Sequence, residues 1–216
     1  MARSVAVVSS VYGGFDVPHA PPEQDIPCEW VMVTDTTGWP SPWREVVEPR
    51  PQMCPRLAAK VAKCWLERYS DADVLIWIDG NVQIHDAGFA SWCLSCLGGA
   101  PLAQFDSSPV RTGIREEAAV AAGMAKYAGQ PVWQQAEAYI ADGHPDNWGN
   151  WWSGLIVRRR DCPDFGTGWL AEMTRWGCEC QISEPYVLRQ TGLRPAGLPR
   201  EDFGRHFSIR GHQAPG

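Results

Sequence analysis

The sequence lacks the short motifs that identify several large enzyme classes. It contains no G-x-G-x-x-G dinucleotide fingerprint, no phosphate-binding loop ending in Gly-Lys-Ser/Thr, no G-x-S-x-G elbow and no H-E-x-x-H pair. These absences argue against several common kinds of enzyme. The function must therefore be inferred from where polar residues fall along the predicted fold.

Long apolar runs are also missing. No stretch approaches the roughly 18 uninterrupted apolar residues that a membrane-spanning helix needs. The first apolar run, Val5 to Val8, is shorter than the roughly 7–15 residues of a secretory signal core. The 216 residues, 44% hydrophobic and 20% charged, suffice for one domain with a sizeable core. We therefore expect a cytoplasmic protein with no membrane span and a single domain over residues 1–216.

Positive charge is scarce, and lysine especially so. The formal net charge is -6, and lysine occurs only at positions 60, 63 and 126. A broad nucleic-acid surface needs a basic patch, and the one local run of basic residues is Arg158-Arg159-Arg160. The charge balance thus disfavours a large nucleic-acid interface.

The sequence holds 8 cysteines, which in a cytoplasmic protein are expected to be free thiols. Two local pairs, Cys93-x-x-Cys96 and Cys178-x-Cys180, could together supply four thiolates to zinc. Cys93 and Cys96 lie in an apolar helical stretch, where a free cysteine acts as a small hydrophobic residue. We therefore favour reduced thiols over a zinc site.

Apolar runs and helical periodicity alternate along the chain. Strands are predicted at residues 4–11, 28–34, 43–48, 73–79, 82–85, 101–106 and 153–158. Helices are predicted at residues 55–69, 86–97, 114–128, 131–142, 164–177 and 182–191, with an irregular tail from Pro199. This alternation predicts an α/β sandwich with a central, mostly parallel sheet. Ligands bind such sheets at the carboxyl ends of the strands, where Asp35, Asp79 and Asn81 fall.

Two patterns of polar residues have the composition of ligand-binding sites. In Trp77-Ile78-Asp79-Gly80-Asn81, a buried strand delivers a carboxylate, a glycine that permits close approach, and an amide. The same residues also suit an ordinary turn. Arg56, Lys60 and Lys63 share one helix face and suit a diphosphate, although a solvated face with Glu67 as ion-pair partner explains them equally well.

These patterns occur in an order that resembles a small family of GT-A-type glycosyltransferases, related to plant mucilage- and pectin-associated proteins and to bacterial polysaccharide-locus glycosyltransferases. The resemblance covers about residues 5–195. It rests on Tyr12-Gly13-Gly14-Phe15-Asp16, Val33-Thr34-Asp35, Arg56 to Lys60, Trp77 to Asn81, Ile156-Val157-Arg158, and Gln181-Ile182-Ser183 before Tyr186-Val187-Leu188.

The resemblance implies a GT-A-like, Rossmann-like fold and transfer of a sugar from a nucleotide-diphosphate sugar, such as a UDP-sugar, to an acceptor hydroxyl. Residues 1–106 would bind the nucleotide and residues 107–216 would form the acceptor side. The implied donor-binding residues are Tyr12, Gly13, Asp35, Arg56, Lys60, Asp79 and Asn81. A divalent cation, Mn²⁺ or Mg²⁺, would be held by Asp79 and Asn81 together with a late histidine, His206 or His212.

One departure affects the catalytic residues. The family usually has Arg-Asp-Gln-x-Ser in its late segment, whereas this chain has Glu179-Cys180-Gln181-Ile182-Ser183, so that Cys180 replaces the aspartate. Asp106, Glu179 and Glu184 are the candidate general bases. Because of this substitution, the sequence is also compatible with a second function, an inactive module that binds a nucleotide-sugar or a glycan. Four classes of acceptor are compatible with the sequence: a glycan, a protein, a small molecule and a modified nucleic-acid base.

Overall fold

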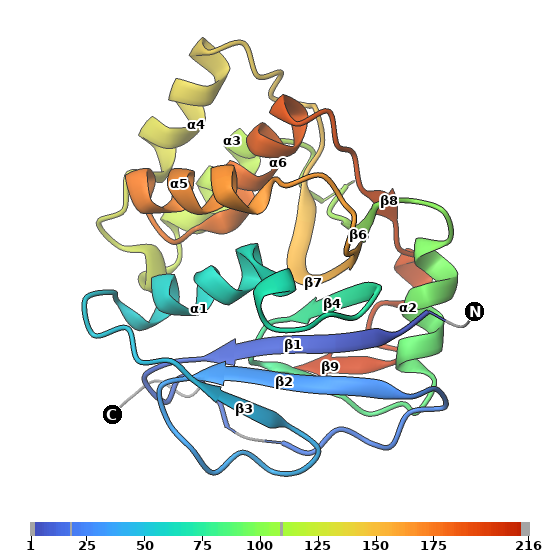
Figure 1. Ribbon diagram of the computed structural model, residues 1–216. Helices are drawn as coiled ribbons and strands as arrows, with labels where there is room; N and C mark the ends of the chain where they lie inside the picture. Colours follow the sequence, from blue (N-terminus) through green and yellow to red (C-terminus); the bar gives the residue numbers. More distant parts are fainter. Residues whose placement is uncertain (1–2, 18, 109, 213–216) are drawn as a thin grey trace.

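The computed structural model describes residues 3–17, 19–108 and 110–212 (Figure 1). The strands are β1 (Val5–Val11), β2 (Cys28–Thr34), β3 (Arg44–Val47), β4 (Val74–Ile78), β5 (Val82–Ile84), β6 (Leu102–Asp106), β7 (Trp151–Arg159), β8 (Ala196–Gly197) and β9 (Phe207–Ile209). The α-helices are α1 (Pro55–Cys64), α2 (Phe89–Leu97), α3 (Ile114–Ala122), α4 (Val132–Ala141), α5 (Gly166–Trp176) and α6 (Cys180–Gln190).

The described strands form a seven-stranded sheet of order β3-β2-β1-β4-β7-β6-β8 and a two-stranded sheet of β5 and β9. In the larger sheet β1 pairs in parallel with β2 and β4, β2 pairs in parallel with β3, and β7 is antiparallel to β4 and β6. Every residue of β1 and β4 is buried, because both strands are covered on two faces. The predicted α/β architecture with a mostly parallel central sheet is confirmed.

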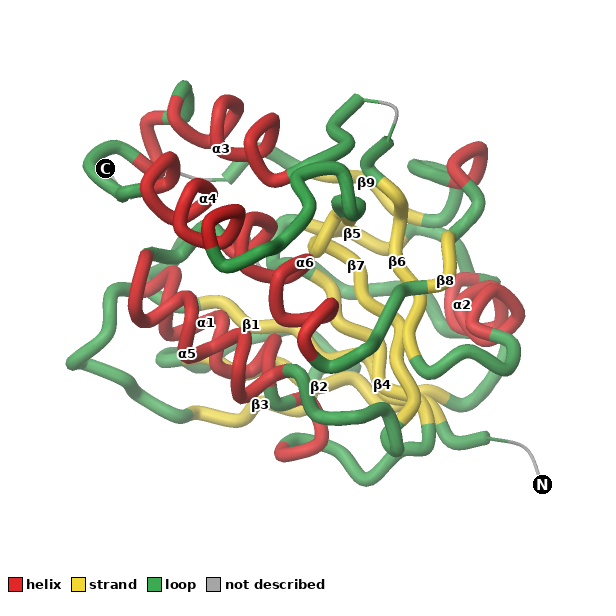
Figure 2. The backbone as a smooth tube through the Cα atoms, turned by 90° about the horizontal axis from the view of Figure 1, so that it is seen from above, coloured by secondary structure: helices red, strands yellow, loops and turns green. Residues whose placement is uncertain are grey.

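The two faces of the sheet have different covers. Helices α1, α5 and α6 pack on one face, against residues such as Val8 and Trp77. Helix α2 packs on the other face, against Val7 and Ile76, together with β5 and β9. Helices α3 and α4 form a smaller cluster that meets α6 at Ile182 and lies away from the sheet (Figures 1 and 2).

Three sequence predictions need correction. The helix expected over residues 114–128 ends at Ala122, because the chain leaves the α-helix at Gly123 and continues as a separate 3₁₀ turn, Ala125–Tyr127. The helix from Pro55 ends at Cys64 rather than Tyr69, because the chain leaves helical geometry at Trp65 and continues as a short 3₁₀ turn, Leu66–Arg68. The tail is not irregular throughout, because Phe207–Ile209 forms β9 and pairs antiparallel with β5. Among the helices of the described residues, none has the length and apolar character needed to cross a membrane.

Candidate functional site

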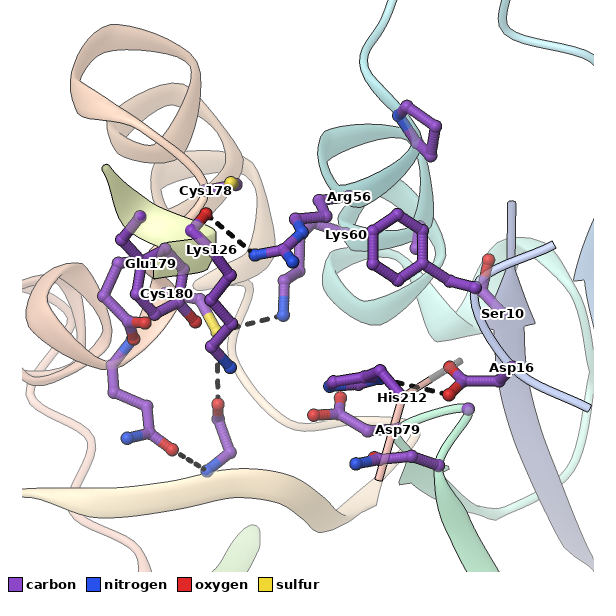
Figure 3. Close-up of a pocket in the computed structure, with 18 of the residues that line it drawn as sticks. Ser10, Asp16, Arg56, Lys60, Asp79, Lys126, Cys178, Glu179, Cys180 and His212 are labelled. Carbon is purple, nitrogen blue, oxygen red and sulfur yellow. Dashed lines mark hydrogen bonds and ion pairs between the residues drawn. The ribbon is translucent and has the colours of Figure 1, made fainter. Parts of the chain in front are cut away.

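A cavity of about 320 Å³ lies where β1 and β4 end, between α1 and the amino end of α6 (Figure 3). Its walls come from the loop after β1, from α1, from the turn after β4, from the segment after α3 and from the start of α6. Of the residues predicted to bind the donor, the lining includes Tyr12, Arg56, Lys60, Asp79 and Asn81.

The other two predicted donor-binding residues shape the loop after β1. The Gly13 amide donates a hydrogen bond to Asp35 Oδ2, at 3.0 Å. Gly13 has φ +64°, and a β-carbon there would lie 2.8 Å from Pro55 Cγ, so this tight turn needs glycine. Gly13 and Asp35 are not among the lining residues of the cavity. In this structure Asp35 fixes the position of the loop.

Tyr12, which precedes Gly13 and lines the cavity, is held in position by two hydrogen bonds. Its hydroxyl donates to the Glu48 carbonyl at 2.7 Å and accepts from Arg50 Nη1 at 2.7 Å. Burial raises the pKa of Tyr12 to about 12, against the opposing effect of Arg50. Tyr12 thus contributes a neutral, rigid part of the wall.

The cations of α1 take different positions. The Arg56 guanidinium lies 4.9 Å from the centre of the Phe15 ring and 5.8 Å from that of Tyr127, and it donates to the Lys126 carbonyl at 2.9 Å. Lys60 also faces the cavity. Lys63, about one helical turn after Lys60 in α1, has a fully buried side chain and is not part of the lining.

Asp79 is tied to the protein by one of its two carboxylate oxygens. Oδ1 accepts from Lys63 Nζ at 3.1 Å and from the Trp77 indole at 2.8 Å. Burial raises the pKa of Asp79, but Lys63, Lys60 and Trp77 lower it by more, so the pKa lies well below its ordinary value. The carboxylate is therefore charged and remains one-third exposed toward the cavity.

Three of the four predicted metal ligands, Asp79, Asn81 and His212, line the cavity, whereas His206 does not. The Asn81 amide donates to the Arg210 carbonyl at 3.0 Å, and His212 Nδ1 pairs with Asp16 Oδ1 at 3.0 Å. His206 lies outside the cavity, where it pairs with Asp86 and stacks on Trp92 at 4.7 Å. Within residues 3–17, 19–108 and 110–212, no three His, Cys, Asp or Glu side chains are arranged to hold a metal ion.

The three candidate general bases lie in different surroundings. Glu179 borders the cavity and caps α6, with Oε1 accepting from the Gln181 amide at 2.9 Å. Asp106 ends β6 and accepts two hydrogen bonds from Ser108, away from the cavity. Glu184 is fully buried, accepts from Gln104 Nε2 at 2.8 Å and is likewise absent from the lining.

Sequence reasoning did not select several other residues of the wall. They include Asp16, Arg111, Glu117, Lys126, Trp152 and Cys180. Asp16 belongs to the segment of residues 12–16 that resembles the glycosyltransferase family, and Lys126 is one of only three lysines, so the sequence could have indicated both. Trp152 and Arg111 reach the cavity only through the pairing of β7 and the packing of α3, and a local pattern cannot show either.

The basic run at residues 158–160 and the two cysteine pairs lie outside the arrangements that a nucleic-acid surface or a zinc site would need. The basic run is engaged in ion pairs: Arg158 with Glu67, Arg159 with Asp161 and Arg160 with Asp71. All eight cysteines are free thiols. Cys93 lies on the face of the sheet covered by α2 and Cys180 on the face covered by α6, which separates the two cysteine pairs.

Comparison with known proteins identifies the fold. No family model and no curated protein matches the sequence. Among solved structures, the chain is similar to the apo structure of WbbM, a bifunctional glycosyltransferase, with 15% identity and a TM-score of 0.52 over 93% of this chain and 40% of that one. It is also similar to the galactosyltransferase LgtC in complex with donor and acceptor sugar analogs, with 12% identity and a TM-score of 0.37 over 87% of this chain and 65% of that one.

The chain thus spans 40% and 65% of the lengths of these two proteins. At such low identity the likeness concerns the fold alone. The likeness to WbbM shows that the α/β sandwich of this chain is of the GT-A-like kind.

Proposed function

We propose that the protein is a glycosyltransferase that transfers a sugar from a nucleotide-diphosphate sugar to an acceptor hydroxyl. One observation carries the proposal. A GT-A-like sheet places the cations of Arg56 and Lys60 in one cavity with the charged carboxylate of Asp79, at the carboxyl ends of its central strands. Ligands of open α/β sheets bind at this edge, and paired cations suit a diphosphate.

Each lining group has a part in this proposal. Arg56 and Lys60, with Lys126 across the cavity, meet the negative charge of the diphosphate and stabilise it as it leaves. Asp79 and Asn81 contact the ribose or the sugar as hydrogen-bond partners. We assign the acceptance of the proton from the acceptor hydroxyl to Glu179, because it borders the cavity whereas Asp106 and Glu184 do not.

The phosphate contacts are tested by replacing Arg56. Calorimetric titration with UDP is expected to show at least about tenfold weaker binding for Arg56→Ala, the loss of roughly one charged hydrogen bond. Arg159→Ala is the matched control, since Arg159 pairs with Asp161 at the opposite end of β7. If UDP, ADP and GDP at millimolar concentration all fail to bind the wild-type protein, the proposal is wrong.

One observation favours a second function, a module that binds a nucleotide-sugar without turning it over. Cys180 stands where the resembling family has an aspartate, and its sulfur contacts Lys60 instead of leaving a carboxylate in the cavity. Hydrolysis or transfer of a bound UDP-sugar supports the enzyme. Release of intact donor after prolonged incubation with glycan acceptors supports the binding module.

A further inference from the structure

Cys180 is surrounded by cationic groups on the wall of the cavity. Its sulfur lies 3.2 Å from Lys60 Nζ (Figure 3), 3.6 Å from Lys63 Nζ and 3.2 Å from Ser153 Oγ. The two ammonium groups come from the same face of α1, and Ser153 comes from β7. Two ammonium donors from α1 thus point at one sulfur, and a hydroxyl from β7 lies within hydrogen-bond distance of it.

The position of Cys180 in its helix adds to this effect. Cys180 is the first residue of α6, directly after the cap residue Glu179. The amino end of a helix carries partial positive charge, which favours an anion in the first turn. The helix and the two lysines therefore favour the same charge on the sulfur.

The remaining neighbours do not oppose this arrangement by direct contact. Asp79 binds Lys63 and Trp77 through Oδ1, and Glu179 binds the Gln181 amide. The titratable and charged groups that face Cys180 are Lys60, Lys63, Asp79, Glu179, Tyr127 and the thiols of Cys64 and Cys178.

The other cysteines are in contrasting surroundings. Burial raises the pKa of Cys28 to about 12 and of Cys162 to about 11. It also raises the pKa of the Cys64, Cys93, Cys96 and Cys178 thiols above the ordinary value. Cys54 is exposed and is the cap residue of α1, so that a free thiol in solution, N-acetylcysteine, serves as the reference for an ordinary thiol.

We propose that Cys180 is a thiolate held by Lys60 and Lys63, and that it is a modification site for small electrophiles, peroxides in particular, inside the cavity. With hydrogen peroxide, the thiolate sulfur attacks one oxygen, an S–O bond forms and the O–O bond breaks. Hydroxide leaves and takes up a proton to become water. The sulfur is oxidised to a sulfenic acid and the peroxide is reduced.

The proposal is independent of nucleotide binding and is tested on the whole chain. Iodoacetamide is the probe: the sulfur displaces iodide from its carbon, and peptide mapping gives the rate at each cysteine. An ordinary thiol gains roughly 25-fold in rate from pH 7 to pH 9, following its thiolate fraction. We expect N-acetylcysteine to show this rise and Cys180 to change by less than about threefold, because a thiolate is already present at pH 7. The slope with pH is independent of how easily the reagent enters the cavity.

Two variants isolate the cause. Lys60→Met is expected to lower the rate at Cys180 at pH 7 by about tenfold or more and to restore the rise with pH. Lys126→Met makes the same change elsewhere in the cavity wall, and we expect no effect on Cys180. After brief exposure to hydrogen peroxide, dimedone is expected to label Cys180. A rate at Cys180 that rises in parallel with that of N-acetylcysteine, or a dimedone adduct confined to other cysteines, overturns the proposal even if neither variant folds.

Discussion

Lys63 and Asp79 join helix α1 to the carboxyl end of β4 through an ion pair of 3.1 Å, and the two partners differ in exposure. The Lys63 side chain is fully buried, whereas the Asp79 side chain is 32% exposed. Lys63 also donates to Ser153 Oγ at 3.0 Å. The ion pair holds Asp79, which lines the cavity, against α1.

The difference in exposure predicts unequal costs for breaking the pair. Asp79→Asn leaves a buried ammonium group without its carboxylate, and we expect a loss of about 3 kcal/mol in the free energy of unfolding. Lys63→Met leaves a carboxylate that water can reach, and we expect a smaller loss, about 1 kcal/mol. Urea unfolding of both variants checks the order. Equal losses, or a larger loss for Lys63→Met, would contradict the structure.

The sequence located some parts of the cavity because they depend on local spacing. Arg56 and Lys60 are four residues apart on one helix, and Asp79 and Asn81 flank a turn at the end of a buried strand, so all four reach the same edge of the sheet. Their roles in donor binding stay predictions. The fold class followed from the same kind of local signal, the alternation of apolar strands and helices.

Other residues depend on long-range pairing that no local pattern contains. His206 and His212 are equivalent by position in the tail, but the pairing of β9 with β5 puts His206 against Trp92 and carries His212 to Asp16. Lys63 shares a helix face with Lys60, yet it points into the core because β4 and β7 bring Asp79 and Ser153 beneath it.

Nucleotide binding without a divalent cation is the second prediction. No three His, Cys, Asp or Glu side chains of the described residues are arranged to hold a metal ion, whereas Arg56 and Lys60 line the cavity. We therefore expect UDP to raise the melting temperature by similar amounts in EDTA and in Mn²⁺. At 100 times Kd the stabilisation is roughly 2.7 kcal/mol. A shift that vanishes in EDTA and returns with Mn²⁺ would refute this prediction.

The third prediction concerns the pH dependence of stability. Burial raises the pKa of Glu184 to about 8, against the lowering effects of Lys63 and Gln104. The ordinary value is 4.5, so between these values the folded chain keeps a proton that the unfolded chain has lost. The contribution of Glu184 to stability is therefore fully present below about pH 4.5 and is lost as the pH rises toward 8.

Glu184→Gln removes this dependence, because the amide stays neutral at every pH. Relative to wild type, the variant is expected to gain at least about 1.4 kcal/mol between pH 5 and pH 8.5, the equivalent of one pKa unit. Glu201→Gln, at an exposed position, is the control and is expected to follow wild type. Parallel curves for wild type and Glu184→Gln in denaturant titrations would show that Glu184 is ionised at neutral pH.

The last prediction separates two of the three candidate general bases, Glu179 and Asp106. Glu179→Gln keeps a side-chain oxygen that can accept from the Gln181 amide, so the cap of α6 and the fold are retained. It removes the group that accepts the proton, and general-base catalysis contributes about 10²–10⁴-fold. We expect turnover of a UDP-sugar to fall by at least about 10²-fold while UDP affinity stays within about threefold of wild type, the pattern of a residue that acts in the transition state. Asp106→Asn is the matched change outside the cavity and should leave turnover near wild type, since Asp106 contacts Ser108 rather than the lining. Normal turnover in Glu179→Gln, or a loss confined to Asp106→Asn, would assign the proton acceptor to another residue.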